Sequence, residues 1–205
     1  MKHEGSISLF QYWDRLREGR AAPRRTDIEP ADIKANLADT FILEQDTRGE
    51  AVFRLAGTRL CAAFGRELKG FAFTSLWAEK DQRILARLIH GAFRLNHVIV
   101  VSLDAASEGG RSNPFELLVL PLDGGQANQR ALGAFSPLEK PFWLGADPIV
   151  QCRIDTLRIV DPNLEPMFLK NRPAVPVPPL APEAPEGEPG RRVRHLLVLE
   201  GGREE

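Results

Sequence analysis

The stretch TFILEQDTRGEAVFRLAGTRLCAAFGRELKGFAFTSLW, residues 40–77, decides the fold. Residues 40–45 and 51–56 are rich in strand-forming side chains, and the four residues between them, Asp-Thr-Arg-Gly, are typical of a hairpin turn. Gly57 and Thr58 then predict the start of a short helix that ends at Gly65, where we expect a left-handed backbone. Residues 68–77 are too aromatic to remain in solvent. The stretch therefore predicts two antiparallel strands followed by short packed helices.

Residues 81–161 predict one long helix and then more strands. Apolar residues between Asp81 and Leu95 fall on one helical face and basic residues on another. Residues 97–107, 114–123 and 130–139 are sheet-forming runs separated by polar, glycine-containing turns. Residues 149–161 are extended in character, either as a strand or as a strand–helix junction. We therefore expect an α+β fold with a five-stranded antiparallel sheet and helices on one face.

Residues 1–38 are predicted to form a helical cap ahead of the sheet. Ser8 is a possible N-cap for an amphipathic helix, and Pro30 marks the start of a second, shorter one. An aromatic helix face outside the sheet packs either on its own sheet or on a second copy of the chain. We hypothesise a homodimer through the apolar face of the first helix, which is made by Leu9, Phe10, Trp13 and Leu16.

The C-terminal part has a different composition. Prolines alternate with small and acidic residues up to Gly190, which is typical of a semi-rigid linker. Residues 191–205 recover a short apolar run that could add a strand to an exposed sheet edge. We thus predict a cap at 1–38, a sheet domain at 39–162, a proline-rich linker at 163–190 and a tail at 191–205.

The order of these elements resembles the PAS fold. Two segments, YWDRLREGRAAPRRTDIEPADIKANLADTFILE (12–44) and FRLAGTRLCAAFGRELKGFAFTSLW (53–77), are similar to a family of small stand-alone bacterial PAS-like proteins formerly of unknown function. The resemblance implies a sheet and covering helices that hold a small ligand or bind another protein domain. It implies a sensory or protein-interaction module in bacterial signalling, with a signalling or regulatory protein as partner.

A possible apolar pocket follows from alternation along the second strand. Two apolar residues flank Arg54 and are therefore expected on the same side of the sheet, under residues of the short and the long helix. The pocket candidates are Phe53, Leu55, Phe64, Leu85, Ile89 and Phe93. Whether they surround a ligand or fill the core stays open.

Two arginines near the N-terminus are candidates for anion contacts. The spacing of Arg20 and Arg24 matches the Arg-x-x-x-Arg element of one class of cyclic dinucleotide receptor, although Ser107 stands one residue too far from Asp104 for that class's second motif. The alternative is an arginine-rich turn that closes the helical cap.

Cofactors of the known PAS subclasses are not expected. The stretch GRELKG, residues 65–70, has no cysteine where flavin photosensors of this fold carry one. His90 shares its helical stripe with Arg83, Arg87 and Arg94, which places it on the polar side and argues against haem. Cys61 and Cys152 are too few for a disulfide framework and are expected to be buried.

Charge and motifs exclude several function classes. The 27 basic and 28 acidic residues nearly cancel, so no general attraction to nucleic acid or to an anionic membrane is expected. No apolar run is long enough for a membrane span, which favours a cytoplasmic protein. No catalytic or metal-binding motif is present. We expect a non-enzymatic module; the alternatives are a receptor for a cyclic dinucleotide or hydrophobic metabolite, and an unrecognised enzyme.

Overall fold

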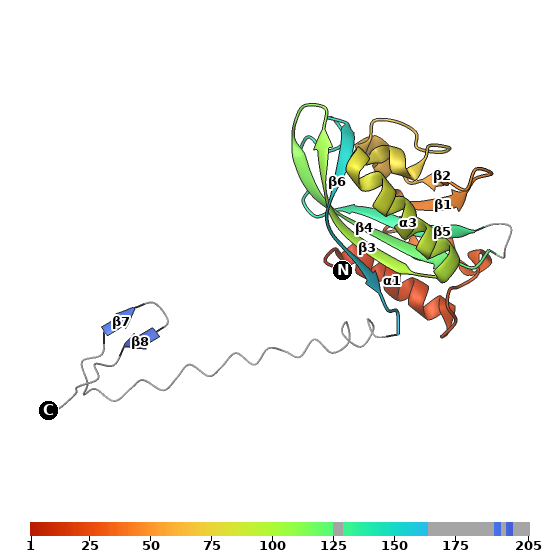
Figure 1. The fold of residues 1–205 in the computed structure, drawn as a ribbon, viewed down its shortest axis with the longest axis horizontal. Helices are drawn as coiled ribbons and strands as arrows, with labels where there is room; N and C mark the ends of the chain where they lie inside the picture. The colour runs from red at the N-terminus through yellow and green to blue at the C-terminus, as the bar shows by residue number, and fades with distance from the viewer. Residues whose placement is uncertain (125–128, 164–190, 194–195, 199–205) are drawn as a thin grey trace. The chain divides into compact units, whose positions relative to one another are not determined.

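A computed structural model describes residues 1–124, 129–163, 191–193 and 196–198 of the 205-residue chain. Six antiparallel strands form one sheet in the order β2-β1-β5-β4-β3-β6 (Figure 1). The strands are β1 (Thr40–Gln45), β2 (Ala51–Ala56), β3 (Val98–Ser107), β4 (Ser112–Leu122), β5 (Arg130–Pro137) and β6 (Ile149–Val160). The chain divides into two compact units, Met1–Lys170 and Asn171–Glu205.

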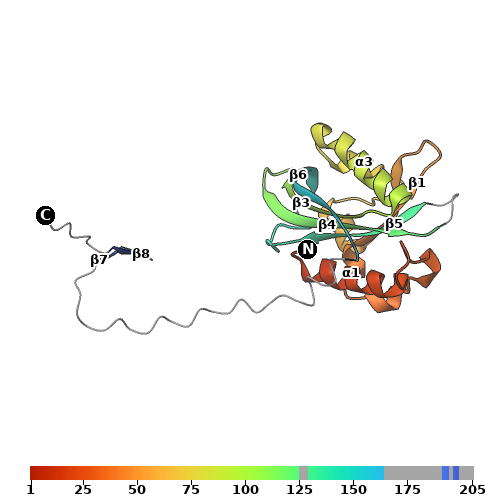
Figure 2. The same ribbon diagram turned by 60° about the horizontal axis from the view of Figure 1, so that its bottom comes forward.

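Helices cover both faces of the sheet (Figure 2). One face carries α2 (Thr58–Ala63), η4 (Phe73–Leu76) and α3 (Glu79–Leu95), which bury a core with inward side chains such as Phe41 and Leu117. The opposite face carries α1 (Glu4–Arg17) and the short helices η1 (Arg25–Asp27), η2 (Pro30–Ile33) and η3 (Leu37–Asp39). Successive side chains of a strand point to opposite faces, so β4 and β5 contribute to both cores.

The predicted α+β architecture is confirmed, and two of its details are corrected. The sheet has six strands instead of five, because residues 149–160 form a full strand that pairs with β3 from Ile149 opposite Ser107 to Val160 opposite Val98. Helices lie on both faces instead of one, because the N-terminal cap packs on the face that α3 leaves uncovered. The predicted cap and sheet domain thus belong to one compact unit.

The predicted dimer face of α1 is buried within its own chain. Leu9, Phe10 and Trp13 are fully buried, and Leu16 packs partly buried on the same core beneath the sheet. These residues are therefore wrong as interface candidates, because the second face of the sheet needs a cover and α1 supplies it. The homodimer itself stays a prediction.

Helix α1 begins earlier than the predicted Ser8. Its N-cap is His3, whose Nδ1 accepts a hydrogen bond from the Gly5 amide at 3.0 Å. The backbone N–H groups of Lys2 and His3 donate to the buried Glu116 carboxylate on β4, at 2.6 and 3.1 Å. These two hydrogen bonds fix the start of α1 on β4. Glu116 is 114 residues from Lys2 and 113 residues from His3 in the sequence.

The second compact unit contains one described element pair. Strands β7 (Arg191–Val193) and β8 (Leu196–Val198) pair with each other in antiparallel register. The apolar run that we expected to add to a sheet edge therefore pairs inside the tail. The predicted proline-rich linker, apart from residue 163, lies outside the described residues.

The turn between β3 and β4 is held by a carboxylate, which makes stability depend on pH. Asp147 accepts hydrogen bonds from the Ser107 hydroxyl at 2.7 Å and the Gly109 amide at 3.1 Å, and pairs with Arg111 at 3.5 Å. These contacts, the Ser107 bond foremost, lower the pKa of Asp147 below its ordinary 3.8. The stabilisation is present above the unfolded-state pKa and is lost as pH falls through the lower folded-state value.

Replacing this carboxylate by an amide tests that dependence. We expect the free energy of unfolding, measured with urea, to fall less in Asp147→Asn than in the wild type when the pH is lowered from about 5 to about 3. Asp104→Asn, at an exposed position of β3, is the control and should follow the wild type. Equal pH dependence in all three proteins would contradict the assignment.

Candidate ligand cavity

Five of the six predicted pocket residues form a filled core. Phe53, Phe64, Leu85, Ile89 and Phe93 all belong to the cluster between the sheet and α2, η4 and α3. The ring of Phe53 lies 5.5 Å from Phe41 and 5.7 Å from Phe73, measured between centroids, as expected for packed aromatic side chains. Ile89 and Phe93 also border a small cavity of about 130 Å³ beside the β1–β2 hairpin. The filled-core interpretation is therefore the better one for this set.

The sixth residue, Leu55, lies on the other face of the sheet. The pairing of β1 with β2 shifts between Ile42 and Leu43, so that Leu43 lies opposite Phe53 while Ile42 lies opposite Leu55. Arg54 is the extra residue of this bulge, and it breaks the alternation that placed Phe53 and Leu55 together. Leu55 is half exposed and lines a separate cavity of about 490 Å³ on that face, so its placement in one pocket with Phe53 was wrong.

A cavity of about 330 Å³ opens at the end of the sheet beside α2. This volume is at the lower end of the range for small-molecule sites. The start of β4, the end of β5, α2 and the loop that follows β5 enclose it. Its lining residues are His3, Asp39, Arg59, Leu60, Ala62, Ala63, Phe115, Phe135, Pro137, Lys140, Pro141, Leu144 and Gly145.

The inner wall of this cavity is aromatic. Phe115 on β4 and Phe135 on β5 are nearly fully buried, and their ring centroids lie 5.0 Å apart. The two side chains point to the α2 side of the sheet because they occupy alternate, inward positions of their strands. The two rings are tilted by 46° to each other, so they close the inner end of the cavity with apolar side chains and form no flat surface.

The rim of the cavity carries an excess of positive and donor groups. Arg59 binds the Asp39 carboxylate through two hydrogen bonds, Nε to Oδ1 at 2.8 Å and Nη2 to Oδ2 at 2.6 Å. The hydrogen bonds and charge of Asp39 raise the pKa of Arg59, and the two opposite charges offset each other. Lys140 adds an exposed ammonium group. His3 Nδ1 accepts from Gly5, which leaves Nε2 as a donor in the neutral ring.

Sequence reasoning missed this cavity because its residues come from five separate segments. No spacing in the sequence relates His3, Asp39 and Lys140. They line one cavity only when the N-terminal segment, η3 and the loop after β5 are in place around the sheet. One usable signal was present. Phe135 on β5 is followed by Pro137 and Pro141, which disfavour a helix interior and a central strand and so indicate an irregular loop beside this ring.

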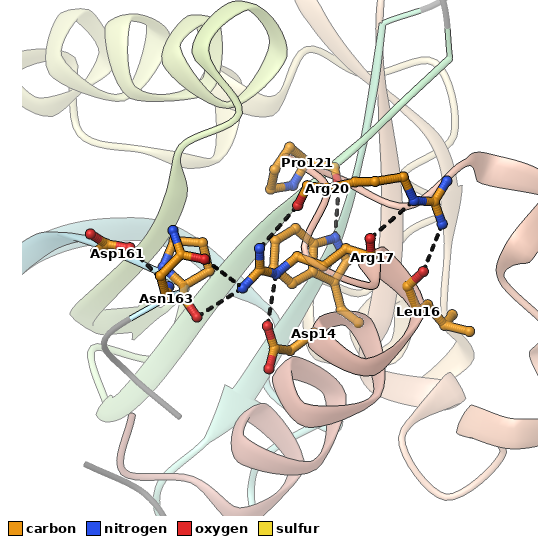
Figure 3. A network of polar contacts seen from close by, with 9 residues as sticks. Asp14, Leu16, Arg17, Arg20, Pro121, Asp161 and Asn163 are labelled. Carbon is orange, nitrogen blue, oxygen red and sulfur yellow. Dashed lines mark hydrogen bonds and ion pairs between the residues drawn. The ribbon is translucent and has the colours of Figure 1, made fainter. Parts of the chain in front are cut away.

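Of the two arginines proposed for anion contacts, Arg20 closes the end of α1: it donates to the carbonyl oxygens of Leu16 and Arg17 at 2.8 and 3.0 Å (Figure 3). Arg20 also pairs with Asp27 at 3.2 Å. The amide of Arg24 donates to the same Asp27 carboxylate at 2.9 Å. These bonds use the guanidinium group of Arg20 inside the chain, so the structure favours the arginine-rich turn over a phosphate site.

Neither cysteine is placed for thiol chemistry, which gives a further prediction. Cys152 is fully buried, and burial raises the pKa of its thiol. Partial burial, and then the nearby Glu67 carboxylate, raise the pKa of Cys61. At neutral pH we expect both to react more slowly with Ellman's reagent than free cysteine does, because less thiolate is present. Reaction of Cys61 in the folded protein at the rate of free cysteine would contradict this.

The strand order β2-β1-β5-β4-β3, with two short helices and one long helix between β2 and β3, defines the PAS class of α+β domains. The family comparison matches residues 1–136 to the PAS domain, and the chain belongs to that family. The match begins at the first residue and so includes the N-terminal helical cap.

Solved structures with similarity to the chain are PAS and LOV domains. The LOV protein of Rhodobacter sphaeroides is 18% identical, with 50% of this chain and 60% of that chain covered and a TM-score of 0.41. The PAS domain of an HTR-like protein from Haloarcula marismortui is 15% identical, with 53% and 90% covered and a TM-score of 0.39. The chain thus spans 60% of the length of that LOV protein. No curated protein sequence matches the chain.

Within residues 1–124, 129–163 and the two tail strands, no helix is long and apolar enough to cross a membrane. In the same part of the chain, no group of three or more histidine, cysteine, aspartate or glutamate side chains is arranged to hold a metal ion.

Proposed function

We propose that this PAS domain is a non-enzymatic sensory module that binds a small anionic molecule at the cavity beside α2 and acts on a regulatory protein in the bacterial cytoplasm. The observation that carries the proposal is the combination of a buried aromatic wall, Phe115 and Phe135, with Lys140 and His3 at the mouth. Sites for small molecules typically combine an apolar lining with a few polar groups that fix orientation.

The charge of the rim favours an anion over a cation or a neutral ligand. Asp39 is the one acidic side chain of the lining, and two hydrogen bonds from Arg59 satisfy it. Lys140 then has no acidic neighbour in the lining to balance its charge. A carboxylate attached to an aromatic or short aliphatic group would place its apolar part against the partly exposed Pro141 and Leu144 and its charge near Lys140. Compounds of this kind are common metabolites, which suits a sensor.

Phenylacetate and its neutral analogue phenylacetamide test the proposed chemistry. We expect phenylacetate at millimolar concentration to shift the amide NMR signals of α2 and of residues 137–145. Its affinity should exceed that of phenylacetamide by about tenfold, since one charge-assisted hydrogen bond is worth about 1.5 kcal/mol or more. Lys140→Glu should remove the preference for the acid.

A variant that fills the cavity separates site binding from general binding. Ala62 lines the mouth and is exposed, so Ala62→Trp should block the cavity without disturbing the core. Ala31→Trp is the matched control, because Ala31 is an exposed alanine of η2 that does not line the cavity. Loss of binding in Ala62→Trp alone supports the site. Binding that survives in Ala62→Trp, or no binding by the wild type, overturns it.

A further inference from the structure

The bulge in β2 creates a row of aliphatic side chains beneath the N-terminal cap. Ile42 on β1 lies opposite Leu55 on β2 and opposite Leu132 on β5. Directly opposite residues of paired strands point to the same face, so the three side chains form one row that spans about 10 Å across three neighbouring strands. Strict alternation would instead place Leu55 on the face of Phe53. The extra residue Arg54 therefore moves one aliphatic side chain into this row, as bulges beside functional sites commonly do.

This row is the floor of the cavity of about 490 Å³ on the cap side of the sheet. The segment from η1 to η3 forms the opposite wall with three further aliphatic side chains. Most of the six are buried, but Leu37 in the wall and Leu55 in the floor are 44% and 50% exposed. The volume lies within the range of small-molecule sites. We name this cavity the cap groove; its floor is Leu55, Ile42 and Leu132, and its wall is Ile28, Ile33 and Leu37.

The rim of the cap groove carries two cations and no acid. Arg25 and Lys34 line it, whereas no aspartate or glutamate belongs to the lining. The backbone N–H of Arg25 donates to the Asp123 carbonyl at 3.2 Å, which fixes Arg25 beside the end of β4. Within residues 1–124 and 129–163, neither the Arg25 guanidinium nor the Lys34 ammonium makes an ion pair or a hydrogen bond. The groove thus offers two positive charges to an anionic group.

The groove suits an alkyl chain better than a peptide. An extended peptide needs partners for its backbone N–H and C=O groups, and aliphatic side chains supply none. The hydroxyl of Thr40 already donates to the Leu37 carbonyl at 2.9 Å. The outer edge of β2 is also closed at Phe53, which accepts from the Gly70 N–H at 2.7 Å and donates to the Phe71 carbonyl at 3.0 Å. An alkyl chain requires no such partners.

We propose that the cap groove is a second ligand site, which binds a medium-chain fatty acid. The alkyl chain lies along the row of the floor, and Arg25 and Lys34 hold the carboxylate. The bound chain covers the exposed parts of Leu37 and Leu55 and so joins the cap to the edge of the sheet. The groove shares no lining residue with the cavity beside α2, so the two sites can be tested independently.

Isothermal titration calorimetry of the full chain tests the ligand class. The probes are hexanoate, octanoate and decanoate, each below its micelle concentration. We expect the dissociation constant to fall about fourfold for each added methylene, because each one is buried on the aliphatic floor. Decylammonium has a similar chain and the opposite charge. It should bind at least about tenfold more weakly than decanoate, because Arg25 and Lys34 repel it.

Charge reversal at the rim tests the position of the carboxylate. Lys34→Glu should raise the dissociation constant of decanoate at least about tenfold, since an attractive charge becomes a repulsive one. Lys140→Glu is the matched control, because Lys140 is also an exposed lysine but lines the cavity beside α2. It should bind decanoate as the wild type does.

A charge in the floor tests the position of the alkyl chain. Leu55→Glu should also weaken decanoate binding at least about tenfold, because it places a carboxylate in the aliphatic row. Ile159→Glu is the matched control, since Ile159 is 53% exposed on the other outer strand, β6. If Leu55→Glu does not fold, Lys34→Glu decides the question, because Lys34 is exposed.

Amide NMR locates the bound chain. Decanoate should shift the signals of residues 28–42 and 55–58 and leave those of residues 137–145 in place. Three results would overturn the proposal: no binding of decanoate by the wild type, equal binding of decanoate and decylammonium, or decanoate binding that Lys34→Glu leaves unchanged. Loss of decanoate binding in Lys140→Glu alone would also overturn it, because the ligand would then occupy the cavity beside α2.

Discussion

Trp13→Ala is expected to lower the free energy of unfolding by about 3–5 kcal/mol, as measured by urea denaturation. Trp13 is fully buried between α1 and the sheet, and its ring stacks on Phe10 at a centroid distance of 6.0 Å. Its indole N–H donates to the Pro121 carbonyl at 2.7 Å. The substitution therefore leaves a large cavity and removes the donor from a buried carbonyl.

The control for this variant is Phe142→Ala, since Phe142 is 91% exposed. It should change stability by less than about 0.5 kcal/mol. The loss in Trp13→Ala should also be independent of protein concentration, because Trp13 packs within one chain. A loss below about 1 kcal/mol, or one that grows on dilution, would contradict the packing of α1 on its own sheet.

Arg17→Met is expected to lower the free energy of unfolding by about 2–3 kcal/mol and to speed amide hydrogen exchange near residue 163. Arg17 is a buried charged residue that joins the end of α1 to the end of β6 (Figure 3). Its Nε donates to Asp14 at 2.7 Å, and its Nη2 donates to the Pro162 carbonyl at 3.0 Å and to Asn163 at 3.1 Å. Methionine keeps the apolar stem and loses these bonds together.

The matched control is Arg15→Met, two positions earlier on the same helix and exposed. Its stability should stay within about 0.5 kcal/mol of the wild type. Because Arg17 also contacts the segment that follows β6, the variant tests whether α1 holds that segment in place. Unchanged exchange at residue 163 in a destabilised protein would show that Arg17 acts only on α1.

The local pattern of the sequence was sufficient for most elements of the sheet. The hairpin turn at residues 46–49 separated two runs of strand-forming residues, and β1 and β2 have the limits predicted from those runs. Gly65 adopts the left-handed backbone expected at the end of α2, with φ of 62°. Helix α3 ends at Leu95 as its periodicity indicated. These features depend on backbone propensities and on neighbours close in sequence.

Contacts between distant segments determined the rest. One extra residue in β2, Arg54, moved Leu55 from the core to the opposite face, and alternation alone cannot reveal such a bulge. The free face of the sheet decided that Trp13 is a core residue, although an amphipathic helix has the same pattern when it forms an interface. The cavity beside α2 combines side chains from five segments.

The sequence by itself determined the order and type of the elements and, through them, the PAS fold. The tertiary structure decided which apolar faces are used within the chain and which remain exposed. The physical reason is that hydrophobic patterning fixes only that a face must be covered, whereas the available partner depends on the packing of the whole sheet. Trp13 is buried against the sheet of its own chain, whereas Leu157 and Ile159 remain exposed on β6.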